Sequence, residues 1–426
     1  MEFRRVNSLK GVITVPGDKS ISHRGIMLGA ISKGKTHITG FLDGADCRST
    51  LHCFKKLGVE IDQHGYEVVI NGKGMYGLTE AYGSLDMGNS GTTTRLISGI
   101  LSAQPFRSRL KGDDSLSQRP MKRVMEPLSL MGATITSDNG NGCLPITITG
   151  HGLQPISYNT PVASAQVKSA ILLAGLYAPG VTSVTEPALS RNHTELMLKS
   201  FGAEIETEGL TVSVKGNADL RGREVEVPGD ISSAAFFIVA GLISSHGDVT
   251  IKNVNINPTR AGIIEVVRAM GGKIELSNKR TVCGEDIADI HVETSALHGT
   301  EISGDIIPTL IDEIPVIAVM AACAVGKTVI KDASELRVKE SDRITAISEN
   351  LKAMGADVTP TADGMIINGG EPLHGAMIKT YGDHRIAMAF AIASLVAESE
   401  VIMDHPRCVD ISYPRFYETL EELKEK

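Results

Sequence analysis

The stretch Pro16-Gly17-Asp18-Lys19-Ser20-Ile21-Ser22-His23-Arg24 joins a glycine turn to a capping carboxylate and two cations. It follows the strand-like run Val12 to Val15 and precedes an apolar run of helical period. Asp and Ser at this place are typical of a helix N-cap, and backbone N–H groups at a helix start favour an anion. Lys19 and Arg24 add positive charge there, so the stretch predicts an anion-binding turn.

A second copy of this turn occurs at Pro228-Gly229-Asp230-Ile231-Ser232-Ser233, again after a short strand-like run and before an apolar helix. This copy contains no Lys or Arg. The two copies predict two halves of similar structure, of which only the first carries cationic side chains at this turn.

Two further expected helix starts carry small polar residues. Gly88-Asn89-Ser90-Gly91-Thr92-Thr93-Thr94-Arg95 contains two glycines that bring backbone N–H groups close to a ligand, and Asn89 or Ser90 could cap the following helix. Ser164-Ala165-Gln166 is a weaker match of the same kind and opens a helix expected over 167–176. A plain capped turn is the alternative interpretation.

The segment Arg337-Val338-Lys339-Glu340-Ser341-Asp342-Arg343 is dense in charge. If it is helical, Lys339 and Arg343 share one face at i,i+4, with Glu340 one step round. A carboxylate held among cations can act as a general acid or base once its pKa is tuned. The alternative is a solvent-exposed helix start held by salt bridges.

Two more segments place titratable groups at expected helix starts. Asp312-Glu313-Ile314-Pro315 supplies two carboxylates before the apolar helix expected over 316–323. Tyr381-Gly382-Asp383-His384-Arg385 precedes a helix expected over 386–396, and its His is a candidate acid or base. Acids at helix starts more often only cap the helix, which is the alternative for both segments.

Basic residues gather at these loop–helix junctions although the net charge of the chain is −8. A small polyanion with phosphate and carboxylate groups suits such a set better than nucleic acid, because the chain is acidic, has no Trp and has few aromatic residues. Besides Lys19 and Arg24, the set contains Arg95, Arg119, Lys122, Arg123, Arg191, Arg337, Lys339, Arg343, Arg385, Arg407 and Arg415.

The segment Gly29-Ala30-Ile31-Ser32-Lys33-Gly34-Lys35-Thr36 fits the GxxxxGK[ST] pattern of a nucleotide-binding P-loop. A true P-loop follows a strand and opens a helix. Here the segment is expected to follow a helix over 26–31 and to open a strand over 37–41, so the P-loop interpretation is rejected.

Composition sets the class of protein. A chain of 426 residues is long enough for two domains, and no apolar run reaches the ~18 residues of a membrane span. The N-terminal residues show no export signal, and the six cysteines are scattered without a CxxC, which argues against zinc and disulfides. The sequence therefore predicts a soluble cytoplasmic protein with no metal, membrane or nucleic-acid partner, and nothing in it demands a partner chain, so a monomer is expected.

One sequence pattern recurs along the chain: a helical run, then Gly with a small or branched neighbour, then two strands joined by a turn. It recurs about every 70 residues, at Leu57–Ile61, Met131–Ile135, Phe201–Ile205, Met270–Ile274 and Met354–Val358. The unit is β-α-β-α-β-β and is complete five times. A sixth unit begins at Glu400–Met403 and lacks a strand, for which Gly11 to Val15 is the candidate.

The repeats predict an α/β (α+β) fold of two domains with three units each. One domain is expected to be discontinuous, with residues 1–18 and 229–426, and the second, residues 19–228, to be inserted into it. The chain would then cross between the domains at the two Pro-Gly-Asp turns, which form a double hinge.

These motifs together resemble the 5-enolpyruvylshikimate-3-phosphate (EPSP) synthase family, the 3-phosphoshikimate 1-carboxyvinyltransferases, from about Lys10 to Tyr417. The resemblance rests on seven motifs in order: PGDKSISHR, GNSGTTTRL, SQRPM, SAQVKSA, DEIPVIA, RVKESDRI and GDHRIAM. It implies two domains with helices packed inside the sheets (an inverse α/β barrel) and an active site in the cleft between them. It also implies transfer of an enolpyruvyl group from phosphoenolpyruvate to the 5-hydroxyl of shikimate 3-phosphate, with no cofactor.

The resemblance also implies roles for individual residues. Asp312 would take the proton of the 5-hydroxyl, Glu340 would protonate and deprotonate the methylene carbon, and Lys19 would stabilise the charged intermediate. The residues implied to contact phosphoenolpyruvate are Lys19, Gly91, Arg119, Gln166, Arg343 and Arg385. Those implied to contact shikimate 3-phosphate are Lys19, Ser20, Arg24, Ser164, Gln166, Ser190, Asp312 and Lys339.

Some positions depart from the family pattern. Ile411 stands where many members have Lys, and Arg407 and Arg415 are the candidates to compensate. Glu335 stands where some members have Asn, and His193 where some have Tyr. Ser90, Leu96 and the Pro-Gly-Asp spelling look more like the glyphosate-tolerant class of the family, which predicts reduced sensitivity to glyphosate.

Two other functions compete with this one. The sister enzyme that transfers enolpyruvate to UDP-N-acetylglucosamine shares the fold, but it depends on a Cys in the loop near Arg119, and residues 115–123 contain none. An inactive anion-binding or regulatory protein is the other alternative, and the joint presence of Lys19, Asp312, Glu340 and Arg385 argues against it.

Overall fold

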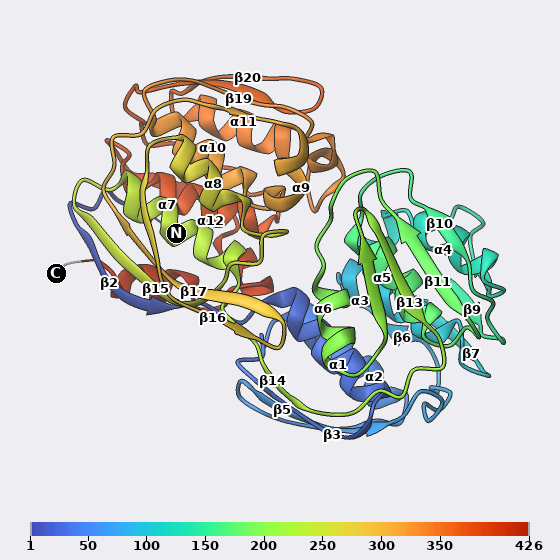
Figure 1. Cartoon of the computed structure of the whole chain (residues 1–426). Helices are drawn as coiled ribbons and strands as arrows, with labels where there is room; N and C mark the ends of the chain where they lie inside the picture. The colour runs from blue at the N-terminus through green and yellow to red at the C-terminus, as the bar shows by residue number, and fades with distance from the viewer. Residues whose placement is uncertain (1, 425–426) are drawn as a thin grey trace. The chain divides into compact units, whose positions relative to one another are not determined.

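The computed structural model describes residues 2–424, which divide into two compact units (Figure 1). Unit 1 contains the residues up to Pro16, then Pro228–Thr281, and the chain from Asp286 onward. Unit 2 contains Gly17–Val227 and the four-residue segment Val282–Glu285. The chain therefore passes from one unit to the other at each Pro-Gly-Asp turn.

Unit 2 contains three four-stranded sheets built on one plan in its described residues. In each sheet the first two strands are parallel, and the third and fourth are added antiparallel. The first sheet has the order β14 (Glu224–Glu226), β3 (Lys33–Thr39), β5 (Glu67–Lys73), β4 (Glu60–His64). The second is β6 (Leu85–Asp86), β7 (Arg107–Lys111), β9 (Ile146–Thr149), β8 (Thr134–Ser137), and the third is β10 (Ser157–Asn159), β11 (Val181–Thr185), β13 (Thr211–Lys215), β12 (Ile205–Glu208).

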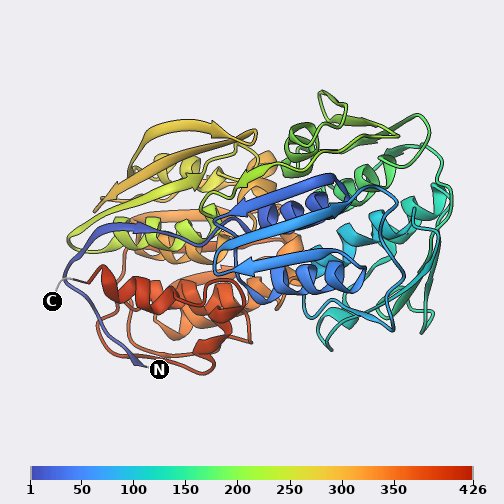
Figure 2. The same ribbon diagram turned by 90° about the horizontal axis from the view of Figure 1, so that it is seen from below.

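The helices of unit 2 alternate between core and cover. α1 (Lys19–Ile31), α3 (Gly91–Leu101) and α5 (Ala165–Gly175) are buried over nearly their whole length, because most of their residues are apolar or small, and the charged side chains of Arg24 and Lys168 are buried with them. The amphipathic helices α2 (Ala45–Lys56), α4 (Lys122–Leu130) and α6 (His193–Ser200) bury one side only. In Figure 2 the blue strands of the first sheet pass in front of α1, on which β5 packs.

Unit 1 repeats this plan in two four-stranded sheets, and its third sheet has three strands in the described residues. Its sheets are β16 (Lys273–Val282), β17 (Glu285–Glu293), β15 (Gly247–Asn255), β2 (Leu9–Thr14); β18 (Glu301–Ile302), β19 (Gly326–Ile330), β21 (Met365–Gly369), β20 (Asp357–Pro360); and β1 (Glu2–Phe3), β23 (Val401–Met403), β22 (Met377–Ile378). Its other helices are α8 (Gly262–Ala269), α9 (Ile307–Leu310), α11 (Arg343–Ala353) and α13 (Phe416–Glu422), with short 3-10 helices at Gly304–Ile306, Ser334–Val338 and Pro406–Ile411.

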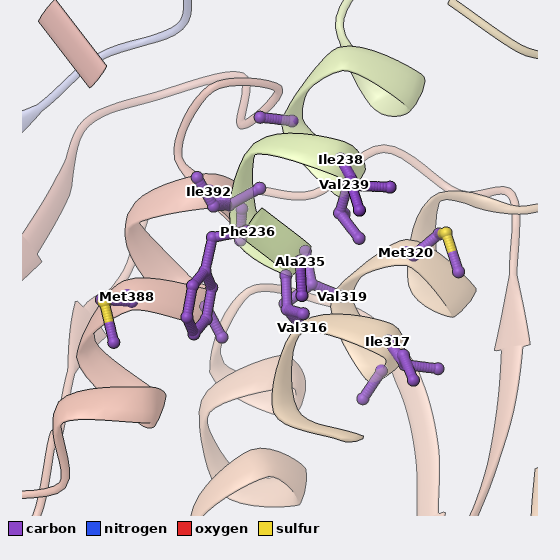
Figure 3. Close-up of a cluster of buried hydrophobic side chains, with 14 of the residues drawn as sticks. Ala235, Phe236, Ile238, Val239, Val316, Ile317, Val319, Met320, Met388 and Ile392 are labelled. Carbon is purple, nitrogen blue, oxygen red and sulfur yellow. The ribbon is translucent and has the colours of Figure 1, made fainter. Parts of the chain in front are cut away.

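Three apolar helices form the centre of unit 1: α7 (Ile231–Ile243), α10 (Ile314–Cys323) and α12 (His384–Ala393). Figure 3 shows Phe236 of α7 beside Ile392 of α12, and Ala235 beside Val316 and Val319 of α10. All of these side chains are buried. Helices therefore lie inside the sheets of the unit, as predicted, although the sheets of each unit remain separate in the described residues and form no continuous ring of strands.

The prediction for the missing strand of the sixth unit was wrong. Residues Leu9–Thr14, which form β2, pair in parallel with β15 and so complete the fourth unit. The sixth unit is completed by β1, which pairs antiparallel with β23 through Glu2 and Phe3. The six residues of β2 match the long strand β15, whereas the three-residue strand β23 needs only a short partner.

The strands β2 and β14 are exchanged between the units. β2 leads into α1 of unit 2 but pairs within unit 1, and β14 leads into α7 of unit 1 but pairs with β3 of unit 2. Each Pro-Gly-Asp turn therefore lies directly after a strand of one unit and before a core helix of the other.

Two other expectations can be compared with the structure. The P-loop pattern lies at the end of α1 and in β3, so the order of helix and strand is inverted as predicted. In the described residues no single helix is long and apolar enough to cross a membrane; one pair, Gly304–Leu310 and Ile314–Cys323, reaches that length together but bends by 112° at its break.

Helices α3 and α5 approach each other closely at Gly99, which predicts a large cost for Gly99→Ala. A Cβ atom there would lie 2.2 Å from the backbone oxygen of Ala170, and backbone cannot rotate away. Helix propensity alone would make this change favourable by about 1 kcal/mol. We expect instead a loss of about 1–3 kcal/mol in the free energy of unfolding, because overpacking outweighs propensity.

Urea unfolding measures this effect, with Gly152→Ala as the matched control. A Cβ atom at Gly152 meets nothing within 4 Å, so this variant should stay within about 0.5 kcal/mol of the wild type. Equal stability of the two variants would show that the helices do not pack as closely as described.

Candidate active site

The starts of the three core helices of unit 2 carry the capping residues on which the prediction of anion binding rested, and we call them the anion-binding half-site of that prediction. Asp18 Oδ1 accepts a hydrogen bond from Ile21 N (2.9 Å), and Ser90 Oγ accepts one from Thr93 N (3.1 Å). Ser164 is the N-cap of α5. Capping by Asp18, Ser90 and Ser164 agrees with the sequence pattern, and the helix dipoles favour negative charge at these ends.

Lys19 and Arg24 both lie in α1 but differ in their surroundings. The Lys19 ammonium contacts the carboxylate of Asp46 and remains partly exposed. The Arg24 side chain is buried and donates to Thr194 Oγ1 (2.6 Å), Ser169 Oγ (2.9 Å) and the carbonyl of Ser20 (2.9 Å). Burial lowers the pKa of Arg24 to about 10, against the attraction of Glu195, so the group remains a cation at neutral pH.

Two guanidinium groups lie beside Gly91 at the start of α3. A Cβ atom on Gly91 would lie 3.0 Å from Arg95 Nη1 and 3.7 Å from Arg119 Nη1. Arg95 donates to Gln166 Oε1 (2.6 Å), and Arg119 donates to Asn89 Oδ1 (2.8 Å). The predicted residues Gly91, Arg119 and Gln166 are therefore brought together, with Arg95 as an additional member.

In unit 1, three cations surround the carboxylate of Asp312. Lys339 Nζ and Arg343 Nη1 are each 3.3 Å from its Oδ1, and Arg260 Nη1 is 3.8 Å from its Oδ2. The Asp312 side chain is mostly buried but keeps an exposed fraction of 13%. The carboxylate can thus reach a substrate while its charge is held in a cationic setting.

Arg343 is almost fully buried and contacts three carboxylates. It donates from Nε to Asp383 Oδ2 (2.8 Å) and from Nη2 to Asp383 Oδ1 (3.2 Å), and Nη2 also donates to Glu340 Oε2 (2.7 Å). Burial opposes the charged form, but the attraction of Asp383 and Glu340 outweighs it and raises the pKa of Arg343 above its usual value. Glu340 keeps 29% of its side chain exposed, so it is both anchored and accessible.

The condition under which Lys339 and Arg343 would share a helix face is not met. The 3-10 helix ends at Val338, Lys339 is extended, and α11 begins only at Arg343, with Asp342 as its N-cap. The Asp342 carboxylate accepts from Thr345 N (3.2 Å), which sets the helix start at this point. Lys339 and Arg343 meet at Asp312 instead, from either side of the break.

Capping was the alternative interpretation of the two remaining segments, and it holds for Asp383 in one but not for Glu313 in the other. Asp383 caps α12 through Arg385 N (2.9 Å), but it also pairs with buried Arg343, whose attraction, against desolvation by burial, lowers the pKa of Asp383. Glu313 makes no capping bond: it is buried, accepts from Ser232 Oγ, and lies 3.7 Å from Arg385 Nη1. His384 is buried at the start of α12.

Arg260 is a residue of this half-site that the sequence did not reveal. Its buried side chain donates to Asp230 Oδ1 (3.0 Å) and Ser232 Oγ (2.6 Å) and faces Asp312. It thereby joins the second Pro-Gly-Asp turn to the acidic centre of unit 1. Asp383 was missed as well, although it lies inside the quoted GDHRIAM motif.

The predicted residues thus form two groups, one in each unit. Unit 2 contains Lys19, Ser20, Arg24, Gly91, Arg119, Ser164, Gln166 and Ser190, and unit 1 contains Asp312, Lys339, Glu340, Arg343 and Arg385. In the part of the chain that the structure describes, no cluster of three or more His, Cys, Asp or Glu side chains could hold a metal ion.

Some basic residues have structural partners elsewhere. Arg337 donates to the carbonyls of Ala362 (2.7 Å) and Thr361 (2.6 Å). Arg415, a candidate to compensate for Ile411, pairs with Glu418 (2.7 Å) and Glu422 (3.0 Å) on the surface of α13. His193, at a position that departs from the family, lies with Nδ1 2.7 Å from Glu285 Oε1, and both side chains are buried.

Comparison with solved structures identifies the class of this fold. An EPSP synthase from Acinetobacter baumannii superposes with a TM-score of 0.90 at 48% identity, and the match covers 99% of this chain and 98% of that one. This chain therefore has the fold of an enolpyruvyl transferase, with helices packed inside the sheets of each unit.

Sequence comparison then identifies the family. The family model described as EPSP synthase (3-phosphoshikimate 1-carboxyvinyltransferase) matches residues 3–420. A protein of that name from Brevibacillus brevis is 55% identical over 425 residues, 100% of both chains, and one from Geobacillus kaustophilus is 54% identical over 420 residues, 98% of both. The chain belongs to the EPSP synthase family.

The predicted activity is confirmed at this level. The chain transfers the enolpyruvyl group of phosphoenolpyruvate to shikimate 3-phosphate, a step of the shikimate pathway. These matches set aside the transfer to UDP-N-acetylglucosamine and the inactive binding protein that the sequence left as alternatives.

The close approach of Arg95 and Arg119 to Gly91 predicts that Gly91→Ala weakens anion binding at this place. The added methyl group crowds Arg95 Nη1 at 3.0 Å and must displace it. We expect the KM for phosphoenolpyruvate to rise about ten-fold, because small displacements of binding groups are costly, while the KM for shikimate 3-phosphate changes less. Steady-state phosphate release measures both values, with Gly152→Ala as the control. Equal effects on the two KM values would contradict the assignment of Gly91 to phosphoenolpyruvate.

Proposed function

We propose that Asp312, Glu340 and Lys19 carry out the chemistry of the transfer. Asp312 accepts the proton of the 5-hydroxyl as that oxygen bonds to C2 of phosphoenolpyruvate, and Glu340 delivers a proton to the methylene carbon C3. The resulting tetrahedral intermediate then loses phosphate as Glu340 takes a proton back from C3, and the hydroxyl proton held by Asp312 leaves with the phosphate or to solvent. Lys19 stabilises the negative charge of the intermediate.

The position of Asp312 is the observation that carries this proposal. A base that starts as a carboxylate needs neighbours that favour its negative charge, and Asp312 has Lys339, Arg343 and Arg260 within 4 Å. Glu340 is held by the same Arg343, so both carboxylates lie on one fixed support. This arrangement supports a pair of proton-transfer groups serving adjacent atoms of one intermediate.

The remaining predicted residues bind the two substrates in this proposal. Phosphoenolpyruvate contacts Lys19, Gly91, Arg119 and Gln166 from unit 2 and Arg343 and Arg385 from unit 1. Shikimate 3-phosphate contacts Lys19, Ser20, Arg24, Ser164, Gln166 and Ser190 from unit 2 and Asp312 and Lys339 from unit 1. Arg forks suit carboxylate and phosphate groups because they donate two parallel hydrogen bonds.

The proposal places the reaction in a cleft between the domains 1–18 with 229–426 and 19–228. In this proposal the residues of the two half-sites, which belong to different units, act on one substrate pair when the units close on it. Asp18 and Asp230 cap the helices that follow the two crossings, which makes these turns the hinges of the closure. Closure would also exclude water from the intermediate.

Asp312→Asn tests the proposed base. Asparagine keeps the size of the side chain and its ability to hydrogen-bond but cannot accept the proton, so we expect kcat to fall by about 10²–10⁴. Phosphate release from phosphoenolpyruvate, with and without shikimate 3-phosphate, is the measurement. Asp357→Asn, at an exposed position of β20, is the matched control and should keep wild-type activity. An unchanged kcat for Asp312→Asn would assign the proton transfer to another group.

Small-angle X-ray scattering tests the closure. The radius of gyration should decrease when shikimate 3-phosphate is added to the free enzyme, because its phosphate and hydroxyl groups have partners in both half-sites. Shikimate, which lacks the phosphate, is the matched control ligand and should have a smaller effect at equal concentration. Identical profiles with and without shikimate 3-phosphate would argue against closure on this ligand.

Three finer expectations belong to the same proposal. We expect a monomer, which light scattering on the purified protein tests directly. We expect a cytoplasmic location, which cell fractionation tests and which suits the six cysteines found without disulfides. Reduced sensitivity to glyphosate, inferred from Ser90 and Leu96, is tested by inhibition assays at fixed phosphoenolpyruvate against a sensitive member of the family.

A further inference from the structure

Lys168 is a fully buried lysine that the proposed mechanism does not use. It lies in α5, two residues after Gln166, and only 1% of its surface is exposed. Its Nζ is 2.7 Å from Glu186 Oε2, 2.8 Å from Glu195 Oε1 and 3.4 Å from the carbonyl of Ser190. All three charged side chains of this triad are buried.

Burial of such a triad is not explained by stability alone. Removing charges from water costs free energy that the ion pairs only partly return, and apolar replacements of similar volume are often at least as stable. A buried charged triad beside a proposed substrate site therefore calls for a functional explanation.

Glu186 connects two segments that carry proposed substrate ligands. Its Oε1 accepts a hydrogen bond from Ser164 N (2.9 Å), at the start of α5. Its Oε2 accepts one from Ser190 Oγ (2.8 Å), in the loop before α6. One carboxylate thus fixes the positions of both serines.

A carboxylate next to a phosphate site would repel the phosphate unless its charge were cancelled. Lys168 contacts the same oxygen, Oε2, that accepts from Ser190. The second buried carboxylate, Glu195, is balanced in part by Arg24, whose positive charge it attracts across α1 and α6. Two cations, Lys168 and Arg24, therefore accompany Glu186 and Glu195.

The shared oxygen also frees the hydroxyl of Ser190. A serine has one O–H donor, so Ser190 cannot donate to Glu186 and to a phosphate at the same time. When Ser190 turns its O–H toward a phosphate, Glu186 Oε2 keeps the ammonium of Lys168 as its donor. The buried oxygen is then not left unpaired, which would otherwise penalise binding.

We propose that Lys168 and Glu186 are positioning residues for the phosphate of shikimate 3-phosphate. Glu186 fixes Ser164 and Ser190, and Lys168 cancels the repulsion by Glu186 and releases Ser190 to the phosphate. This inference rests on the proposed function, in which Ser164 and Ser190 bind shikimate 3-phosphate, and it extends the recognition of that substrate to two side chains that do not touch it.

The test is a double-mutant cycle read separately for the two substrates. Lys168→Met keeps the length of the side chain and removes its charge, and we expect the KM for shikimate 3-phosphate to rise at least about ten-fold. The KM for phosphoenolpyruvate should stay within about two-fold. Adding Glu186→Gln to Lys168→Met removes the uncancelled carboxylate, so the double variant should recover a large part of the lost affinity.

Controls separate this role from a structural one. Lys215→Met removes the same charge from an exposed pair with Glu204 in the same unit and should leave both KM values unchanged. A residue that only stabilised the fold would lower the melting temperature without separating the two KM values. Equal changes in both KM values, or effects in the double variant that simply add, would overturn the inference.

The remaining outcomes are also decisive. If Lys168→Met alone does not fold, Glu186→Gln and the double variant can still be compared with the wild type, because the double variant has the same net charge as the wild-type triad. A KM for shikimate 3-phosphate that does not change in Glu186→Gln would overturn the inference. If Ser164→Ala and Ser190→Ala leave the KM for shikimate 3-phosphate unchanged, the proposed function fails, and this result is distinct from a failure of the inference.

Discussion

The pairing of buried Arg343 with three carboxylates is the interaction on which the acidic half-site depends. A guanidinium group without water needs negative partners, and Asp383, Glu340 and Asp312 supply them within 3.3 Å. Removing one partner of such a buried set typically costs about 3–5 kcal/mol, because a charge is left uncompensated. The same contacts that stabilise Arg343 therefore fix the two carboxylates to which we assign the proton transfers.

The repeat explains why side chains from distant parts of the sequence meet in these sites. Every unit of the repeat places a turn before a core helix, and the caps Asp18, Ser90 and Ser164 occupy equivalent positions in the three repeats of unit 2. Three helix N-termini in one unit create a positive region before any charged side chain is added. Only a few cationic side chains near these helix starts are then needed to bind a polyanion.

The sequence predicted well those features that depend on local patterns. The caps Asp18 and Asp230 follow from residue type and position, and so does the rejection of the P-loop, whereas the choice of Ser90 over Asn89 as a cap came only from the structure. Lys339 and Arg343 would have shared a face only if residues 337–343 were helical, but α11 begins after Asp342, a residue type strongly preferred at the N-cap.

Features that depend on tertiary contacts could not be predicted in this way. Arg260 lies in no recognisable motif, and its importance comes from the side chains of Asp230 and Asp312, which follow from the fold. Lys168 lies within the quoted SAQVKSA motif, yet only the structure shows that it is buried against Glu186 and Glu195. The place of β2 was also missed, because pairing depends on the length of the partner strand.

The two Pro-Gly-Asp turns share a sequence pattern but differ in the charged side chains around them. With Asp18 aligned to Asp230, Lys19 corresponds to Ile231 and Arg24 to Phe236, and both of these apolar residues lie in the core of unit 1. Unit 1 instead draws its charges from segments after the first helix, and Arg260 brings one of them back to the Asp230 cap. The cap of the first turn thus precedes two cations, Lys19 and Arg24, whereas the cap of the second turn accepts a hydrogen bond from Arg260. The first turn therefore leads into a helix that carries cations, and the second turn is bonded through Asp230 to Arg260, which lies 3.8 Å from Asp312.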